Sequence, residues 1–176
     1  QHHHAHIASV LGENELHGPV IGIALDGTGY GTDGTIWGGE ILIATRRDFK
    51  RFWHLPSFAL PGGAAAILNP ERTAYALLKA YGERDDAFFG QFALDNPQFA
   101  PFLEHLENRA LLDQMIDKGL NTPMCSSAGR LFDAVSALLG ICAHPGYDGE
   151  AACLLEASAW RECEGGHPLT ARTFHE

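Results

Sequence analysis

A long glycine-rich segment between two apolar runs constrains the fold of this chain more than any other feature. VIGIAL, at 20–25, is a continuous apolar run with β-branched members, which is typical of a strand buried on both faces. DGTGYGTDG follows directly as a long turn. TIWGGEILIATR, at 35–46, returns as a second strand, whose paired glycines indicate a bulge or a close backbone approach. FKRFWHL predicts a third strand. This order predicts a β-meander that carries a functional loop.

The remaining segments have helical periodicity. In HHHAHIASVL the apolar residues Ile7, Val10 and Leu11 fall at i, i+3 and i+4. Further helices are predicted over PERTAYALLKAYGERDD and DGEAACLLEASAWREC. NPQFAPFLEHLENRALLDQMIDKG is also predicted to be helical, with an interruption or a start at Pro101. The helix predicted over SSAGRLFDAVSALLG has an apolar face formed by Leu131, Val135, Leu138 and Leu139. The fold class is therefore mixed α/β, a meander followed by helices.

Composition narrows the class of partner and the location. The chain is 45% hydrophobic and 19% charged, as in ordinary globular proteins, and its formal net charge is −10. Clustered Lys and Arg are needed to coat nucleic acid, so we expect no nucleic-acid partner. No run reaches the roughly 20 apolar residues of a membrane span, and no signal peptide is visible, so we expect a cytoplasmic protein. The cysteines form no CxxC pair, which favours free structural thiols.

The first residues, QHHHAHIAS, contain a possible metal site. Residues i and i+4 share one face of a helix, so His2 and His6 project together as two ligands of one divalent metal would. His3 and His4 are predicted to point elsewhere. A purification tag or an exposed helix end is the alternative, because two imidazoles are not a complete site.

Two glycine-containing motifs favour binding of an anionic ligand. Glycines after a strand let the N–H groups of DGTGYGTDG approach a phosphate, and Asp26 at the strand end can orient a metal-bound water or a ligand hydroxyl. A tight hairpin is the alternative. In SSAGRLFDA, Gly129 allows close approach to a helix N-terminus and Asp133, one turn later, can accept from a ribose. The alternative there is a capped helix with a surface Asp and a solvated Arg130.

These motifs together resemble the HypF carbamoyltransferase family. QHHHAHIAS, DGTGYGTDGTIWGGE, the LPGG turn, SSAGRLFDAVSALLG and YDGEAA occur in the family's order over residues 1–156. The resemblance implies an actin/Hsp70/sugar-kinase-like (ASKHA) lobe that binds nucleotide. It implies conversion of carbamoyl phosphate and ATP to a carbamoyl adenylate. The carbamoyl group then passes to the C-terminal cysteine of the partner HypE, for the cyanide ligands of [NiFe]-hydrogenase.

The resemblance also implies roles for particular residues. His2 and His6 are the expected ligands of a divalent metal, with iron, zinc and magnesium not distinguished. Asp26 is the expected catalytic residue. The residues expected to contact the carbamoyl or phosphate group are Asp26, Gly27, Thr28, Gly29, Tyr30 and Gly31. Those expected to contact the nucleotide are Gly129 and Asp133.

Departures from the family pattern leave alternatives open. Ala64 follows the LPGG turn where the family usually has Asp, and the family's metal site takes a further carboxylate from later in the domain. We therefore expect residues 1–176 to be part of a catalytic domain, truncated at both ends. The alternatives are an O-carbamoyltransferase or threonylcarbamoyl transferase acting on a small molecule or tRNA, and a non-catalytic nucleotide-binding fragment. The acidic charge disfavours tRNA.

Overall fold

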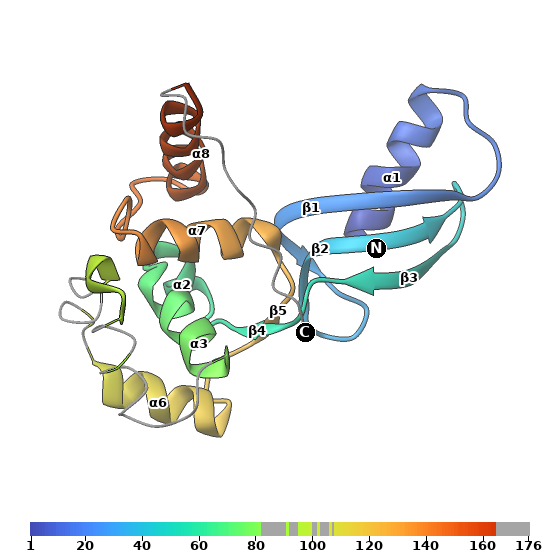
Figure 1. The fold of residues 1–176 in the computed structure, drawn as a ribbon. Helices are drawn as coiled ribbons and strands as arrows, with labels where there is room; N and C mark the ends of the chain where they lie inside the picture. Colours follow the sequence, from blue (N-terminus) through green and yellow to red (C-terminus); the bar gives the residue numbers. More distant parts are fainter. Residues whose placement is uncertain (82–90, 92–94, 100–101, 103–105, 107, 165–176) are drawn as a thin grey trace.

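A sheet built on a three-stranded meander positions the N-terminal helix. The computed structural model describes residues 1–81, 91, 95–99, 102, 106 and 108–164 (Figure 1). Within these residues five strands form one sheet: β1 (Val20–Tyr30), β2 (Ile36–Ala44), β3 (Phe49–His54), β4 (Phe58–Ala59) and β5 (Met124–Cys125). β2 pairs antiparallel with β1 and β3, and parallel with β5, which pairs antiparallel with β4. The predicted meander and the mixed α/β class are confirmed.

Strand β1 differs from the sequence prediction in burial and length. Gly22 and Ala24 are buried, whereas Ile21, Ile23 and Leu25 are 75%, 68% and 67% exposed, so burial on both faces is wrong. The cause is that α1 (His2–Glu13) covers one face of β1, while Ile21, Ile23 and Leu25 project from the opposite face. The strand also continues, through a register shift between Leu25 and Gly29, as far as Tyr30. The predicted long turn is thus shorter, because its first residues lie in the strand.

The predicted helices are present where the structure describes them. Ser127 caps α7, its Oγ accepting from the N–H of Arg130, and Gly140 follows the helix with a φ of +69°. The predicted interruption at Pro101 lies outside the described residues. The helices after the meander are α2 (Ala64–Leu68), α3 (Glu71–Tyr81), α6 (Arg109–Lys118), α7 (Ala128–Leu138) and α8 (Glu150–Glu164), with a 3₁₀ turn at Pro97–Phe99.

Two cores anchor the elements that carry the candidate site. In the first, Ile7 and Leu11 of α1 pack with Trp37 and Leu42 of β2, while Val10 is 53% exposed, contrary to the predicted face. In the second, Leu131 of α7 packs against the buried residues Phe58, Leu60, Ala66 and Cys125. Helix α7 also contacts α3, α8 and β1 (Figure 1). In the described part of the chain, no helix combines the length and the apolar character needed to cross a bilayer.

The apolar face predicted for α7 is confirmed only in part, since Leu131 packs against the second core and Val135 and Leu138 are half-buried. Its buried residues are Ala128, Arg130, Asp133, Ala134, Ser136 and Ala137, and Leu139 is 47% exposed. The helix is packed on both sides, so small side chains that permit close approach are buried and the leucines lie at the margins. A charged pair, Arg130 and Asp133, is therefore buried on this helix beside the apolar residues.

Candidate functional site

The two histidines predicted as metal ligands lie together with Asp26. His2 and His6 are one turn apart on α1, and their Nε2 atoms are 3.1 Å apart. Asp26 lies beside them on β1, with its Oδ2 2.8 Å from Nε2 of His2. One ligand atom from each residue lies within 4.8 Å of the other two. Two imidazoles and a carboxylate at this spacing suit a divalent cation that keeps a further position for water or substrate. We call these residues the His–Asp cluster.

Hydrogen bonding alone satisfies this cluster poorly. Nε2 of His2 faces both Oδ2 of Asp26 and Nε2 of His6. A neutral imidazole carries one hydrogen, on one of its two nitrogens. One hydrogen on Nε2 of His2 cannot point at both neighbours. A cation between the residues accepts lone pairs from all of them at once, so the arrangement fits a metal better than it fits a set of hydrogen bonds.

The carboxylate of Asp26 is held in its ionised form. Burial alone would raise its pKa, but hydrogen bonds from the backbone N–H of Gly27, from the His2 ring and from the backbone N–H of Thr28 outweigh burial and lower the pKa. The N–H of Gly27 donates to Oδ1 at 2.7 Å. The ionised form is the one that binds a metal.

The glycine-rich segment at 26–34, which we call the glycine segment, supports the His–Asp cluster. The N–H of Gly27 is directed at Asp26, and the N–H of Gly31 donates to the carbonyl of Thr35. Gly29 is buried, and a Cβ there would collide with the His3 ring and approach His2. Thr28 is exposed, and Tyr30 is 80% exposed. The amides of Gly27, Thr28 and Gly31 thus already have partners within the chain. The contact predicted between this segment and a carbamoyl or phosphate group stays a prediction.

The N-terminus of α7 is fixed directly on the glycine segment. A Cβ at Gly129 would lie 2.8 Å from Cα of Gly27, so the close approach needs glycine at this position of the helix. The hydroxyl of Ser127 lies 2.7 Å from the carbonyl oxygen of Asp26 and 2.8 Å from that of Gly27. The structure thus brings Gly129 against the backbone of Asp26 and Gly27.

Asp133 lies deeper than expected. Its Oδ2 is 3.2 Å from Nη1 of Arg130, and both side chains are buried. Burial raises the pKa of Asp133, although the charge of Arg130 opposes this. Nη2 of Arg130 also lies 2.6 Å from Oδ1 of Asp148. The alternative interpretation, in which Asp133 lies at the surface and Arg130 is solvated, is therefore wrong. A contact between Asp133 and a nucleotide stays a prediction.

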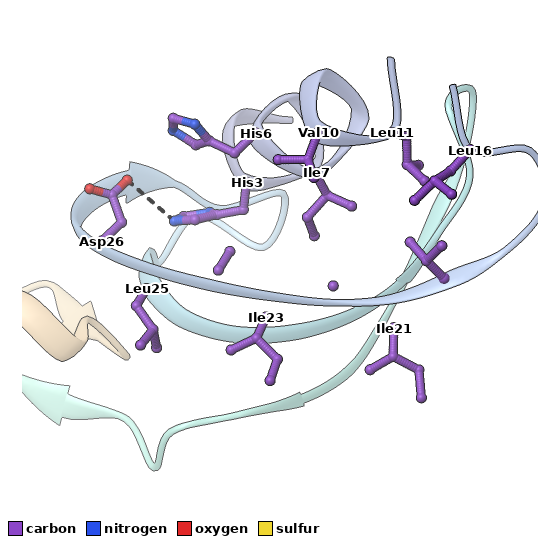
Figure 2. Close-up of a pocket in the computed structure, with 13 residues that line it drawn as sticks. His3, His6, Ile7, Val10, Leu11, Leu16, Ile21, Ile23, Leu25 and Asp26 are labelled. Carbon is purple, nitrogen blue, oxygen red and sulfur yellow. Dashed lines mark ion pairs between the residues drawn. The ribbon is translucent and has the colours of Figure 1, made fainter. Parts of the chain in front are cut away.

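His3 is part of the site although the sequence set it aside. Its side chain is fully buried, and Nε2 is 3.5 Å from Oδ2 of Asp26 (Figure 2). The ring stacks on Trp37 at 6.2 Å between centroids. His4 does point elsewhere, with Nε2 2.8 Å from the carbonyl oxygen of Thr45. Successive residues of an α-helix are rotated by about 100° about its axis, so helical spacing alone directs His3 away from His2. The position of β1 beside α1 is what brings Asp26 close to His3.

A second polar cluster, which we call the Glu40 network, links β2, β3 and the turn at 31–35. Glu40 is fully buried on β2, with Oε2 2.6 Å from Nε of Arg51. The hydroxyl of Ser126 donates to the other oxygen, and Nη1 of Arg51 lies 3.0 Å from Oδ2 of Asp33. The Arg51 guanidinium stacks on Trp37 at 3.9 Å. A charged residue within the apolar strand WGGEILIA was the available signal for this network.

The charges of the Glu40 network stabilise one another. Burial alone would raise the pKa of Glu40, but hydrogen bonds from Arg51 and Ser126 outweigh it and lower the pKa. For Asp33, burial is outweighed by bonds from Thr35 and Trp37 and by the charge of Arg51, which together lower the pKa to about 2. The network therefore fixes β2, β3 and the 31–35 turn in one arrangement.

A groove runs from the His–Asp cluster along α1 and β1. It has a volume of about 620 Å³ and is lined mainly by apolar side chains of these two elements. Figure 2 shows His6 and Asp26 at one end and Leu16 and Ile21 toward the other. The cluster thus lies at the end of an open apolar surface, where a ligand can reach it.

The other predicted features have mainly structural roles in the described residues. The cysteines are unpaired, as predicted, and burial raises the pKa of Cys125 to about 11. In the LPGG turn, Gly62 and Gly63 adopt positive φ, and Ala64 begins α2. Neither the turn nor Ala64 is in the His–Asp cluster.

The fold is that of a known class of domain, as comparison with protein families shows. Residues 22–174 match the family model for the carbamoyltransferase Kae1-like domain, second subdomain. The chain therefore belongs to the HypF carbamoyltransferase family, in this part of its Kae1-like domain. The predicted ASKHA-like fold class is confirmed by this match and by the solved relatives.

The particular relatives are HypF proteins several times longer than this chain. It is 44% identical to carbamoyltransferase HypF2 of Cupriavidus necator over 97% of its length and 20% of that protein. It is 45% identical to HypF of Rhodobacter capsulatus over 90% of its length and again 20% of that protein. The chain thus spans about a fifth of these relatives.

Solved structures agree with this assignment. A full-length HypF in a phosphate- and nucleotide-bound form superposes with a TM-score of 0.72 at 43% identity, over 89% of this chain and 19% of that one. HypF of T. kodakarensis superposes with a TM-score of 0.76 at 38% identity, over 92% of this chain and 21% of that one.

Proposed function

We propose that this chain forms the metal-binding part of a HypF-type carbamoyltransferase site. The observation that carries the proposal is the convergence of His2, His6 and Asp26 within 4.8 Å, in a chain of the HypF family. The substrates would be carbamoyl phosphate and ATP, joined as a carbamoyl adenylate. The acceptor would be the C-terminal cysteine of HypE, and the compartment the cytoplasm.

The donor set favours some metals over others. Two imidazoles and one carboxylate suit iron or zinc better than magnesium, which prefers oxygen ligands. When bound, such an ion would act as a Lewis acid on the carbonyl or phosphoryl oxygen of the carbamoyl donor. His2 and His6 would hold it from α1 and Asp26 from β1.

The chain's remaining residues would keep this geometry fixed. Ser127 and Gly129 hold the N-terminus of α7 against the backbone of Asp26 and Gly27. This packing would keep the Asp26 carboxylate close to His2 and His6. The attacking thiol would come from the partner. Cys125 is unsuited to that role, since it is buried and its pKa is raised to about 11.

The test uses the full-length protein with ATP, carbamoyl phosphate and HypE. We expect a mass gain on the terminal cysteine of HypE from the wild type and none from the double variant His2→Ala, His6→Ala. Far-UV circular dichroism of the double variant should be unchanged, because both side chains are exposed. Transfer by the double variant at the wild-type rate would refute the metal role.

The same assay separates the alternatives. Carbamoylation of a small hydroxyl compound or of tRNA, with HypE unmodified, would identify a different acceptor. Nucleotide binding with no transfer to any of the three would indicate a non-catalytic binding module.

A further inference from the structure

We propose that His3 is a positioning residue that donates a hydrogen bond to Asp26 when His2 and His6 bind the metal. The inference rests on the proposed metal site. His3 is fully buried, and its Nε2 has no hydrogen-bond partner in the described structure. The Oδ2 atom of Asp26 is 3.5 Å away, slightly beyond hydrogen-bond distance. A buried nitrogen directed at a metal-binding carboxylate needs an explanation, because such a group is costly when unpaired.

The tautomer of His3 follows from Gln1. The Gln1 Oε1 accepts from the backbone N–H of His4 at 2.9 Å, so the Nε2H₂ group of Gln1 occupies the other side of the amide. That group donates to the carbonyl of Tyr30 and lies 3.2 Å from Nδ1 of His3. Since the amide nitrogen can only donate, Nδ1 of His3 must accept. The neutral ring therefore carries its hydrogen on Nε2, the atom that faces Asp26.

Packing keeps the ring in this orientation. One face of His3 stacks on Trp37, with an interplanar angle of 29°. Gly29 lies against the ring at the position of Cε1, where any Cβ would collide. A hydrogen on Nδ1 would point at the amide hydrogens of Gln1, so the contact with Gln1 also disfavours a doubly protonated ring.

Metal binding changes which histidine can donate to Asp26. Nε2 of His2 lies 2.8 Å from Oδ2 of Asp26. An imidazole nitrogen that binds a metal offers its lone pair and carries no hydrogen. His2 therefore cannot be a ligand and donate to Asp26 through the same nitrogen. Nε2–H of His3, whose position is set by Gln1 and Trp37, is then the histidine donor next to that carboxylate.

The test measures metal affinity in the full-length protein by competition between Co²⁺ and a chromophoric chelator. We expect His3→Leu to weaken Co²⁺ binding by roughly 10- to 100-fold, as loss of a partner to a metal ligand does. His3→Gln, whose amide nitrogen can occupy the position of Nε2, should restore most of the affinity. His4→Gln is the matched control on the same helix, and it should bind Co²⁺ as the wild type does, because His4 bonds to Thr45.

The outcomes distinguish this inference from the proposed function. Wild-type protein that binds no Co²⁺ would refute the metal site itself. Wild-type affinity in His3→Leu would refute only the role of His3. Equal loss in His3→Leu and His3→Gln would show that the imidazole acts by packing and would also overturn the inference. If His3→Leu does not fold, the comparison of His3→Gln with His4→Gln still decides: a His3→Gln loss of 10-fold or more contradicts the proposal.

Discussion

The His–Asp cluster and the Glu40 network lie on the same meander but differ in how their polar atoms are satisfied. In the Glu40 network, Arg51 makes contacts with Glu40, Asp33 and Ser126. No buried side-chain nitrogen or oxygen of these four residues lacks a hydrogen-bond partner in the described structure, and the carboxylate of Glu40 is shielded from water. Such a network is complete without any further group.

The His–Asp cluster has the opposite character. His2 and His6 are exposed, and their Nε2 atoms face each other at 3.1 Å. The buried Nε2 of His3 beside them has no hydrogen-bond partner in the described structure. The comparison supports the proposed metal site: the polar atoms of the Glu40 network already have partners within the chain, whereas those of the His–Asp cluster leave room for an added cation.

The largest effect on stability should come from breaking the Glu40 network. We expect Glu40→Ala to lower the free energy of unfolding by about 3 kcal/mol, because Arg51 is left partly buried with only Asp33 as its acidic partner. Urea unfolding of this chain measures the change. Glu13→Ala, at an exposed site on α1, is the control and should lie within about 0.5 kcal/mol of the wild type. If Glu40→Ala lowers the free energy of unfolding by less than about 1 kcal/mol, the proposed structural role of the network is refuted.

Much of the fold was predictable because its signals are local. The meander follows from apolar runs and glycines, and α7 begins where Ser127 caps it. The pairing of His2 with His6 follows from helical spacing. The burial of β1 was not predictable, since a continuous apolar run does not show whether a second layer covers its outer face. Ile23 remains 68% exposed on an edge strand.

The parts of the site that were missed depend on contacts between distant segments. His3 reaches Asp26 only because α1 lies across β1. Arg130 looked like a solvated side chain, yet it is buried against Gly27 by the packing of α7. A pattern within one helix or strand cannot reveal a partner 20 or 100 residues away.

A smaller, pH-dependent effect should come from Asp33. Its pKa is about 2 in the folded chain and near 4 when unfolded, so its charge stabilises the fold above about pH 4 and the contribution is lost as pH falls through about 2. The side chain is 43% exposed, so solvent screens much of this effect, and we expect Asp33→Asn to cost about 1 kcal/mol at pH 7. Urea unfolding at pH 7 and at pH 2.5 should show the difference shrinking at the lower pH. A cost that is equal at both values would contradict the assignment to charge.

The smallest effect should come from the His–Asp cluster when no metal is added. We expect His6→Ala to change the free energy of unfolding by less than about 0.5 kcal/mol, because the side chain is exposed and no buried group loses a partner. Metal then separates the variants. At a Co²⁺ concentration 100 times the dissociation constant, the wild type should gain about 2.7 kcal/mol and His6→Ala little or nothing, since an ion that binds only the folded state stabilises that state. An equal gain in both proteins would place the ion elsewhere. A large loss in His6→Ala without metal would mean that the cluster is structural, as the Glu40 network is.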